Sequence, residues 1–171
     1  MFFRNSQRLA RLCKQKGVPF IVNDRVDIAL SAGADGVHLG DDDLPLKIAR
    51  KLLGRGKIIG VSSHSVPEAL RKVRKDPSYV AFGPVFRSQT KSTRRRLLGL
   101  SSLKKISECV RKPVVAVGGI DQKTASQAIA AGASAVAVVQ SVLGSTDPGR
   151  ATKNLVHSFF AFSELSKRRN A

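Results

Sequence analysis

The sequence predicts an α/β protein built from repeated strand–helix units. Short apolar runs recur along the chain without polar alternation, which is typical of parallel strands buried on both faces. Segments with helical spacing of apolar residues separate these runs. Polar residues and glycines gather directly after the runs, where a barrel of such units builds its site. Together these observations indicate an enzyme built from alternating strands and helices.

The apolar runs predict six strands, at 18–22, 36–39, 57–61, 79–83, 113–117 and 135–139. Helical spacing is found before the first strand and again over residues 67–73, 100–110 and 125–131, with Ser65 as an expected N-cap. Two similar joints, at 32–37 and 131–136, end a helix at a glycine and enter a strand within three residues. Any tight helix–strand loop can look like this. Two of them in a chain of uniform units nevertheless favour one barrel domain over 1–171 rather than an open sheet.

Composition narrows the class of protein. The chain has 171 residues, of which 42% are hydrophobic, enough for a single domain with a core. It has no stretch of about 18 apolar residues that could cross a membrane, and its first residues lack the apolar run of a secretory signal. Its two cysteines are too few for a disulfide scaffold. We therefore expect a cytoplasmic protein with no membrane partner.

The charge is strongly positive. Thirty Lys and Arg against twelve Asp and Glu give a formal net charge of +18, which attracts phosphorylated metabolites or polyanions. The basic residues are spread along the chain, so we expect most of them on solvated surfaces. No aromatic-rich RNA signature accompanies them, and nucleic acid is therefore not the expected partner.

Two carboxylates follow neighbouring predicted strands. Asp24 comes after the first strand and Asp43 after the second. Mg²⁺ commonly binds through one or two carboxylates while phosphate and water supply its other ligands, so the pair is a candidate metal site. Either residue could instead cap the helix that follows, and the spacing leaves both interpretations open.

Later strand ends offer candidate phosphate contacts. Gly118-Gly119 precedes a helix that opens near Asp121, and Gln140-Ser141 opens the next one, an arrangement that lets backbone N–H groups approach a phosphate. A tight turn is the alternative explanation of the two glycines. Lys91 could bring a cation to a second phosphate group or simply be solvated. His38, inside the second strand, is expected in the core rather than in catalysis.

The order of these motifs resembles the thiamine-phosphate synthase family, within the thiamine monophosphate synthase and TenI superfamily of (β/α)8 TIM barrels. The resemblance runs from about residue 8 to residue 150. It is carried by Val22-Asn23-Asp24-Arg25, Gly36-Val37-His38-Leu39-Gly40, Gly60-Val61-Ser62, Phe82-Gly83-Pro84-Val85-Phe86, Thr90-Lys91 and Val117-Gly118-Gly119-Ile120.

The resemblance implies a transferase that joins a pyrimidine diphosphate to a thiazole phosphate, giving thiamine phosphate and pyrophosphate. In that family the pyrophosphate ionises away and the thiazole nitrogen captures the pyrimidine methyl cation, while Mg²⁺ and cationic groups stabilise the departing charge. By this resemblance Asp24 and Asp43 hold Mg²⁺, and Asn23, Ser62 and Lys91 contact the diphosphate, with Lys91 and Ser62 catalytic. The thiazole phosphate is assigned to Ser88, Thr90, Gly118, Gly119, Val139 and Gln140.

The chain also departs from the family pattern. We expect six βα units, without the family's first strand, first helix and second strand, and hence without its Gln-x-Arg-x-Lys segment that binds pyrophosphate. Three explanations stay open: a fragment of a longer enzyme, a chain whose open barrel edges are covered by a second copy or another partner, or a decayed copy with impaired turnover. Parallel edges left open are a liability for a soluble protein.

Two other functions remain as alternatives. A TenI-type aminothiazole tautomerase shares the fold but typically has Gly-His-Val-Phe where this chain has Gly83-Pro84-Val85-Phe86. A non-catalytic protein could use the same barrel and its positive charge to bind phosphates or polyanions, and such binding would weaken steeply with salt.

Overall fold

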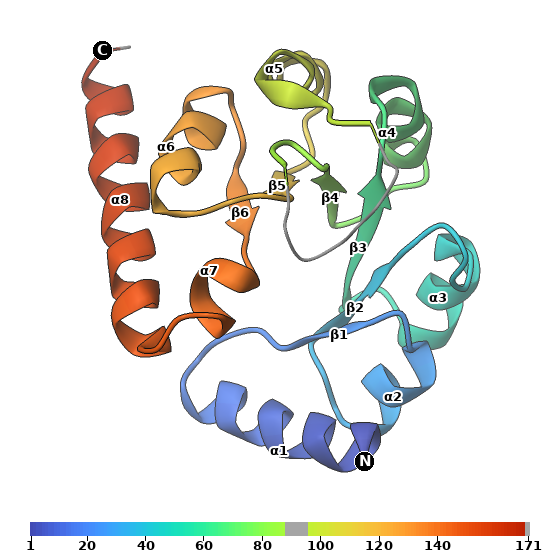
Figure 1. The fold of residues 1–171 in the computed structure, drawn as a ribbon. Helices are drawn as coiled ribbons and strands as arrows, with labels where there is room; N and C mark the ends of the chain where they lie inside the picture. The colour runs from blue at the N-terminus through green and yellow to red at the C-terminus, as the bar shows by residue number, and fades with distance from the viewer. Residues whose placement is uncertain (88–95, 170–171) are drawn as a thin grey trace. The chain divides into compact units, whose positions relative to one another are not determined.

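The computed structural model describes residues 1–87 and 96–169, with side chains up to residue 158. Helices and strands alternate along the chain (Figure 1). In order they are α1 (Phe2–Gln15), β1 (Ile21–Asn23), α2 (Val26–Ser31), β2 (Gly36–Leu39), α3 (Leu46–Leu53), β3 (Ile58–Ser63), α4 (Val66–Val73), β4 (Tyr79–Phe82), α5 (Gly99–Cys109), β5 (Val114–Val117), α6 (Gln122–Ala130), β6 (Ala135–Ala137), α7 (Gln140–Leu143) and α8 (Pro148–Arg169).

The strand predictions are confirmed, with ends that differ by a few residues at most. The six strands form a sheet in the order β1-β2-β3-β4-β5-β6, so each strand lies beside the next one in the sequence. The pairs β1–β2, β2–β3 and β5–β6 are parallel. Sequential parallel order follows from the helix that connects each strand to the next, because parallel neighbours need a crossover connection.

The chain divides into two compact units. The first comprises residues 1–62 and 72–80. Its core gathers apolar side chains of β1, β2 and β3 and of the helices between them: Val22, Val26, Ala29, Ala34, Val37, Leu39, Ala49, Leu53 and Ile59. In its sheet Asn23 lies opposite His38, and His38 lies opposite Gly60. These three residues therefore form one row across β1, β2 and β3.

The second unit comprises residues 63–71 and 81–171. Leu103 and Ile106 of α5, Val114 and Ala116 of β5, and Ala125 and Ala128 of α6 are buried. The small residues on α6 permit close packing. Figure 1 shows α8 running alongside α6, and Leu155 of α8 is buried. The parallel pair β5–β6 therefore has helical cover.

Helix starts follow the sequence signals. Ser65 accepts a hydrogen bond from the backbone N–H of Glu68 at 3.3 Å, which confirms it as the cap of α4. Asp121 caps α6 by accepting from the N–H groups of Lys123 and Thr124, and Thr124 returns a bond to the Asp121 N–H. This reciprocal arrangement is a capping box. The predicted opening of a helix near Asp121 is confirmed.

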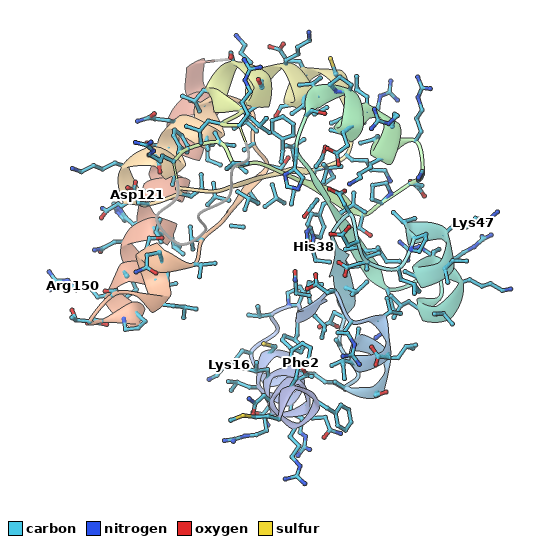
Figure 2. The ribbon with its side chains drawn as sticks, turned by 45° about the vertical axis from the view of Figure 1, so that its right-hand side comes forward. Phe2, Lys16, His38, Lys47, Asp121 and Arg150 are labelled. Atoms are coloured by element: carbon cyan, nitrogen blue, oxygen red, sulfur yellow. The ribbon has the colours of Figure 1, made fainter. Side chains whose placement is uncertain are left out.

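Within the residues that the structure describes, no helix has the length and apolar character needed to cross a membrane. Among those same residues, no Lys or Arg with a described side chain is buried. Lys16, Lys47 and Arg150 are exposed, and Figure 2 shows their side chains extending away from the ribbon. The expectation of a solvated positive charge is confirmed for this part of the chain.

Candidate active-site residues

Asn23 and Asp24 form the polar end of β1. The Asn23 side-chain amide donates to Oδ1 of Asp24 at 2.6 Å, and the backbone N–H of Asp24 donates to the carbonyl of His38 at 2.8 Å. Asp24 has a positive φ of 66°, a conformation that Asp tolerates better than most residues. The sharp turn directly after the strand therefore holds an exposed carboxylate at this sheet edge.

Asp43 lies after β2, where its carboxylate closes a short turn. Oδ2 of Asp43 accepts the backbone N–H of Gly40 at 2.6 Å, and a Cβ on Gly40 would lie 3.2 Å from that oxygen. The capping alternative is wrong for both carboxylates, because Arg25 is the N-cap of α2 and Pro45 that of α3. The helix after Asp43 begins two residues later than a cap at Asp43 requires, and the helix after Asp24 begins one residue later than a cap at Asp24 requires.

The two carboxylates fit a Mg²⁺ site that needs further ligands. In the part of the chain that the structure describes, no three His, Cys, Asp or Glu side chains are grouped so that they could hold a metal. Mg²⁺ does not need such a cage, since it keeps several waters and takes oxygens from substrate phosphates. Asp24 and Asp43 follow two strands that pair in parallel, so both carboxylates belong to the same edge of the sheet.

Ser62, near the end of β3, is tied to two side chains that the sequence did not single out as functional. Its hydroxyl lies 2.9 Å from Nε2 of His38, and Nδ1 of His38 lies 3.0 Å from the hydroxyl of Tyr79. The two rings stack with centroids 5.5 Å apart. Both ring nitrogens of His38 have hydrogen-bond partners, as expected of a satisfied histidine, but the residue is only half-buried. The glycine at position 60 was the available signal, because it opens space for Tyr79.

The electrostatics of His38 connect it to the carboxylates. Burial lowers the pKa of His38, the Asp43 charge opposes that effect, and Lys72 adds to it. Lys72 donates to the backbone carbonyl of Ser62 at 2.7 Å and pairs with Asp41. An imidazole, a serine hydroxyl, a lysine and carboxylates thus converge in the first unit.

Gly118 and Gly119 follow β5 in the second unit, and both have positive φ values, of 93° and 63°. A Cβ on Gly118 would lie 2.7 Å from the Cβ of Pro84, and a Cβ on Gly119 would lie 2.4 Å from the carbonyl oxygen of Arg87. The backbone of the segment after β4 also bonds to this strand end, with Phe86 N–H donating to the Gly118 carbonyl at 3.0 Å. Tight packing therefore accounts for both glycines, and a phosphate contact is an additional role to be tested.

Val139 and Gln140 follow β6, the strand that pairs with β5 through Val117 and Ala137. Val139 is the N-cap of α7, which begins at Gln140 as expected, and both residues are exposed. The hydroxyl of Ser141 donates to the Ile120 carbonyl at 3.0 Å, which ties α7 to the residue after the glycine pair. The parallel pairing thus brings together the strand ends to which the thiazole phosphate was assigned.

Ser88, Thr90 and Lys91 lie outside the residues that the structure describes, so their predicted roles stay predictions. Arg87 is the last described residue before them, and it is exposed.

Comparisons with known proteins identify the family of this chain. The family model described as thiamine monophosphate synthase matches residues 1–142. The chain belongs to the thiamine monophosphate synthase family. Among curated members, the thiamine-phosphate synthase of Chloroflexus aurantiacus is 45% identical over 147 residues, which cover 86% of this chain and 68% of the relative. The one from Methanocella arvoryzae is 46% identical over 143 residues, covering 84% and 68%.

A solved structure extends the family likeness to the fold. The thiamine phosphate pyrophosphorylase from Pyrococcus furiosus superposes with a TM-score of 0.87 at 36% identity, covering 94% of this chain and 76% of that one. The predicted fold class, βα units of the (β/α)8 TIM-barrel type, is confirmed. An orotidine 5'-phosphate decarboxylase from Pyrococcus horikoshii shows the same fold at 18% identity, with a TM-score of 0.66 over 90% of this chain and 80% of that one.

Proposed function

We propose that this chain is a thiamine-phosphate synthase, a transferase that joins a pyrimidine diphosphate to a thiazole phosphate and releases pyrophosphate. The observation that carries the proposal is family membership together with the polar strand ends that keep the family's residue types. The relatives are synthases, and the chain keeps Pro84 where tautomerases typically have His, so neither alternative function is favoured.

The two compact units divide the residues assigned to the two substrates. The first unit carries Asn23, Asp24, Asp43 and Ser62, which we assign to the pyrimidine diphosphate and its metal. The second carries Gly118, Gly119, Val139 and Gln140, which we assign to the thiazole phosphate. Both substrates are phosphorylated small molecules, in keeping with the formal charge of +18.

The reaction breaks one bond and forms one. The bond between the pyrimidine methylene carbon and the pyrophosphate oxygen breaks, and the leaving pyrophosphate keeps the electron pair. The thiazole nitrogen then donates its lone pair to the methylene carbon. Ser62 and Asn23 would hold the diphosphate by hydrogen bonds, which matters most as negative charge develops on the leaving group.

Asp24 and Asp43 are the residues that would hold Mg²⁺. When bound, Mg²⁺ supplies electrostatic stabilisation of the departing pyrophosphate. Lys91 is proposed to add a positive charge to the same group.

The direct test is a single-turnover assay of the purified chain with both substrates and Mg²⁺, following thiamine phosphate. Formation of product on the timescale of family enzymes supports the proposal. A folded chain that yields no product with saturating substrates contradicts it.

Variants of the carboxylates test the metal assignment. Asp24→Asn and Asp43→Asn remove one charge each while keeping an oxygen for the local hydrogen bonds. We expect both to lower turnover at least tenfold and to raise the Mg²⁺ concentration needed for half-maximal rate. Asp42→Asn is the matched control, because Asp42 is an exposed carboxylate beside Asp43. Normal turnover and Mg²⁺ dependence in both test variants would show that the assignment is wrong.

A further inference from the structure

The direction of the Ser62 hydroxyl decides what that residue can do for an anionic ligand. A serine has one hydroxyl proton. If that proton is donated to His38, Ser62 offers a phosphate only lone pairs, which repel it. If the proton is directed away from His38, Ser62 can donate a hydrogen bond to a phosphate oxygen. The partners of His38 therefore determine whether Ser62 suits the role assigned to it.

The hydrogen-bond chain through His38 permits two directions. Oγ of Ser62 lies 2.9 Å from Nε2, and the Tyr79 hydroxyl lies 3.0 Å from Nδ1. A neutral imidazole has one N–H and one lone pair. Protons therefore run from Tyr79 through His38 to Ser62, or in the reverse direction from Ser62 to Tyr79.

The chemistry of the two hydroxyls favours the first direction. A phenol is a stronger acid than an aliphatic alcohol and so makes the better donor to an imidazole nitrogen. Burial raises the pKa of Tyr79, so the phenol keeps the proton that it donates.

We propose that Tyr79 is a positioning residue for Ser62: its hydroxyl donates to Nδ1 of His38, Nε2–H then donates to Oγ of Ser62, and the Ser62 proton points to the substrate diphosphate. The proposal rests on the proposed function for the identity of the ligand. The hydrogen-bond direction itself can be measured without any ligand.

The packing around Tyr79 shows that its position is built into the fold. Gly60 lies opposite His38 in the sheet, and a Cβ at Gly60 would lie 2.0 Å from Cζ of Tyr79. The missing side chain at Gly60 is the space through which the phenol reaches the imidazole. The Tyr79 and His38 rings stack with an interplanar angle of 19°, which fixes the ring against its partner.

The backbone of Ser62 is also held in place. Lys72 donates to the Ser62 backbone carbonyl at 2.7 Å. With the backbone anchored, rotation of the hydroxyl is the remaining freedom at this residue, and His38 restricts that freedom. Figure 2 labels His38, the central member of the hydrogen-bond chain, which belongs to β2.

The first experiment measures the tautomer of His38 by ¹⁵N NMR of the full chain at neutral pH. The chain has three histidines, so single substitutions of His64 and His157 assign the signals. We expect Nε2 protonated and Nδ1 bare in the wild type, with a shift toward the Nδ1–H form in Tyr79→Phe. A wild-type ring with Nδ1–H and a bare Nε2 would overturn the proposal.

The second experiment measures kcat/KM for the pyrimidine diphosphate in a double-mutant cycle. Tyr79→Phe keeps the aromatic ring and removes the hydroxyl, and we expect about a tenfold loss, the worth of one hydrogen bond to a charged group. Ser62→Ala should cost at least as much. Adding Tyr79→Phe to Ser62→Ala should cost no more than about twofold further, because Tyr79 acts through Ser62. Full additivity of the two losses would overturn the proposal.

Ser78→Ala provides the matched control. Ser78 precedes Tyr79 in the chain, and its hydroxyl accepts from the backbone N–H of Ile59 at 3.0 Å. Its loss removes a hydrogen bond that joins the residue before β4 to β3, and we expect the His38 tautomer to stay unchanged. A change of tautomer in this control equal to that in Tyr79→Phe would contradict a specific role for Tyr79.

The two proposals fail in different ways. If the wild type gives no thiamine phosphate, the proposed function fails, and the tautomer measurement still decides the direction of the hydrogen bonds. If turnover is normal and Tyr79→Phe changes neither the tautomer nor kcat/KM, the positioning role fails alone. If Tyr79→Phe does not fold, as judged by circular dichroism, the wild-type tautomer decides.

Discussion

Asp24 combines an uncommon backbone conformation with an exposed carboxylate. Its φ of 66° lies in the left-handed region, which costs a residue with a Cβ about 1 kcal/mol. Backbone strain of this kind often persists where function requires the side chain. Asp76, at the joint between α4 and β4, has a similar φ of 59° but no assigned role. Comparing the two residues therefore separates the effect of a positive φ on stability from the effect of the carboxylate on turnover.

Replacing either aspartate by glycine tests this separation. Asp24→Gly should leave the free energy of unfolding unchanged or raise it by up to about 1 kcal/mol, because glycine adopts positive φ freely, while turnover falls at least tenfold. Asp76→Gly should show a similar stability effect with turnover within about twofold. Urea unfolding and the single-turnover assay measure the two quantities. Equal loss of turnover in both variants would remove Asp24 from the site.

At the scale of single elements, α6 depends on the Asp121 cap and the β5 end depends on its glycines. The pKa of Asp121 is lowered, mainly by the hydrogen bond from the Thr124 backbone N–H; desolvation opposes this effect, and the Thr124 side chain and the Lys123 backbone add to it. Gly119 combines a positive φ with a close approach of the Arg87 carbonyl. Both features hold the segment between β5 and β6, which includes Gly118 and Gly119 of the proposed thiazole phosphate contacts.

Asp121→Ala should lower the free energy of unfolding by about 1 kcal/mol through loss of the N-cap. The lowered pKa means that the folded state favours the carboxylate. The stabilisation is therefore fully present above the ordinary value of 3.8 and is lost as pH falls through the lowered folded value. Urea unfolding as a function of pH measures it. Ser126→Ala, on a half-buried position of the same helix, is the control, and an equal loss there would rule out the cap as the cause.

Gly119→Ala should destabilise the protein more than Gly33→Ala. Both glycines have similar φ values, of 63° and 68°, so the conformational cost, about 1 kcal/mol, is shared. Nothing lies within 4 Å of a Cβ at Gly33, whereas a Cβ at Gly119 would lie 2.4 Å from a backbone oxygen. Urea midpoints of the two variants measure the difference. Equal midpoints would show that the segment after β4 shifts to make room for the added methyl group without lowering the free energy of unfolding.

At the scale of the whole molecule, the formal charge of +18 acts over distances longer than any single contact. Such a charge raises the rate at which anionic substrates reach the protein, and salt screens it with a Debye length of about 8 Å at physiological ionic strength. It also raises the concentration of polyanions near the surface, which explains why charge by itself does not identify the substrate.

The charge predicts a salt effect on substrate capture. As ionic strength rises, kcat/KM for the pyrimidine diphosphate should fall while kcat changes little, because screening acts on encounter more than on the bound complex. Steady-state kinetics at several salt concentrations, with Mg²⁺ held saturating, measure both. A kcat/KM that does not change with salt would show that the net charge plays no part in capture.

Local patterns placed several candidate residues at the strand ends where the structure has them. Asp24 and Asp43 were selected because they follow consecutive apolar runs, and Gly118 and Gly119 because a glycine pair after an apolar run is visible in the sequence. Tyr79 could not be found in this way. It is separated from His38 by 41 residues, and their contact depends on β3 carrying a glycine opposite His38.

The alternation of strands and helices, the helix starts at Ser65 and Asp121, and the family can all be recognised in the sequence. They follow from periodicity, capping chemistry and motif order, all of which are local along the chain. Which side chains meet is established by the folded chain: Tyr79 with His38, His38 with Ser62, and Gly119 with Arg87. Strand register and the space left by a glycine are properties of paired strands, and no single segment of the sequence contains them.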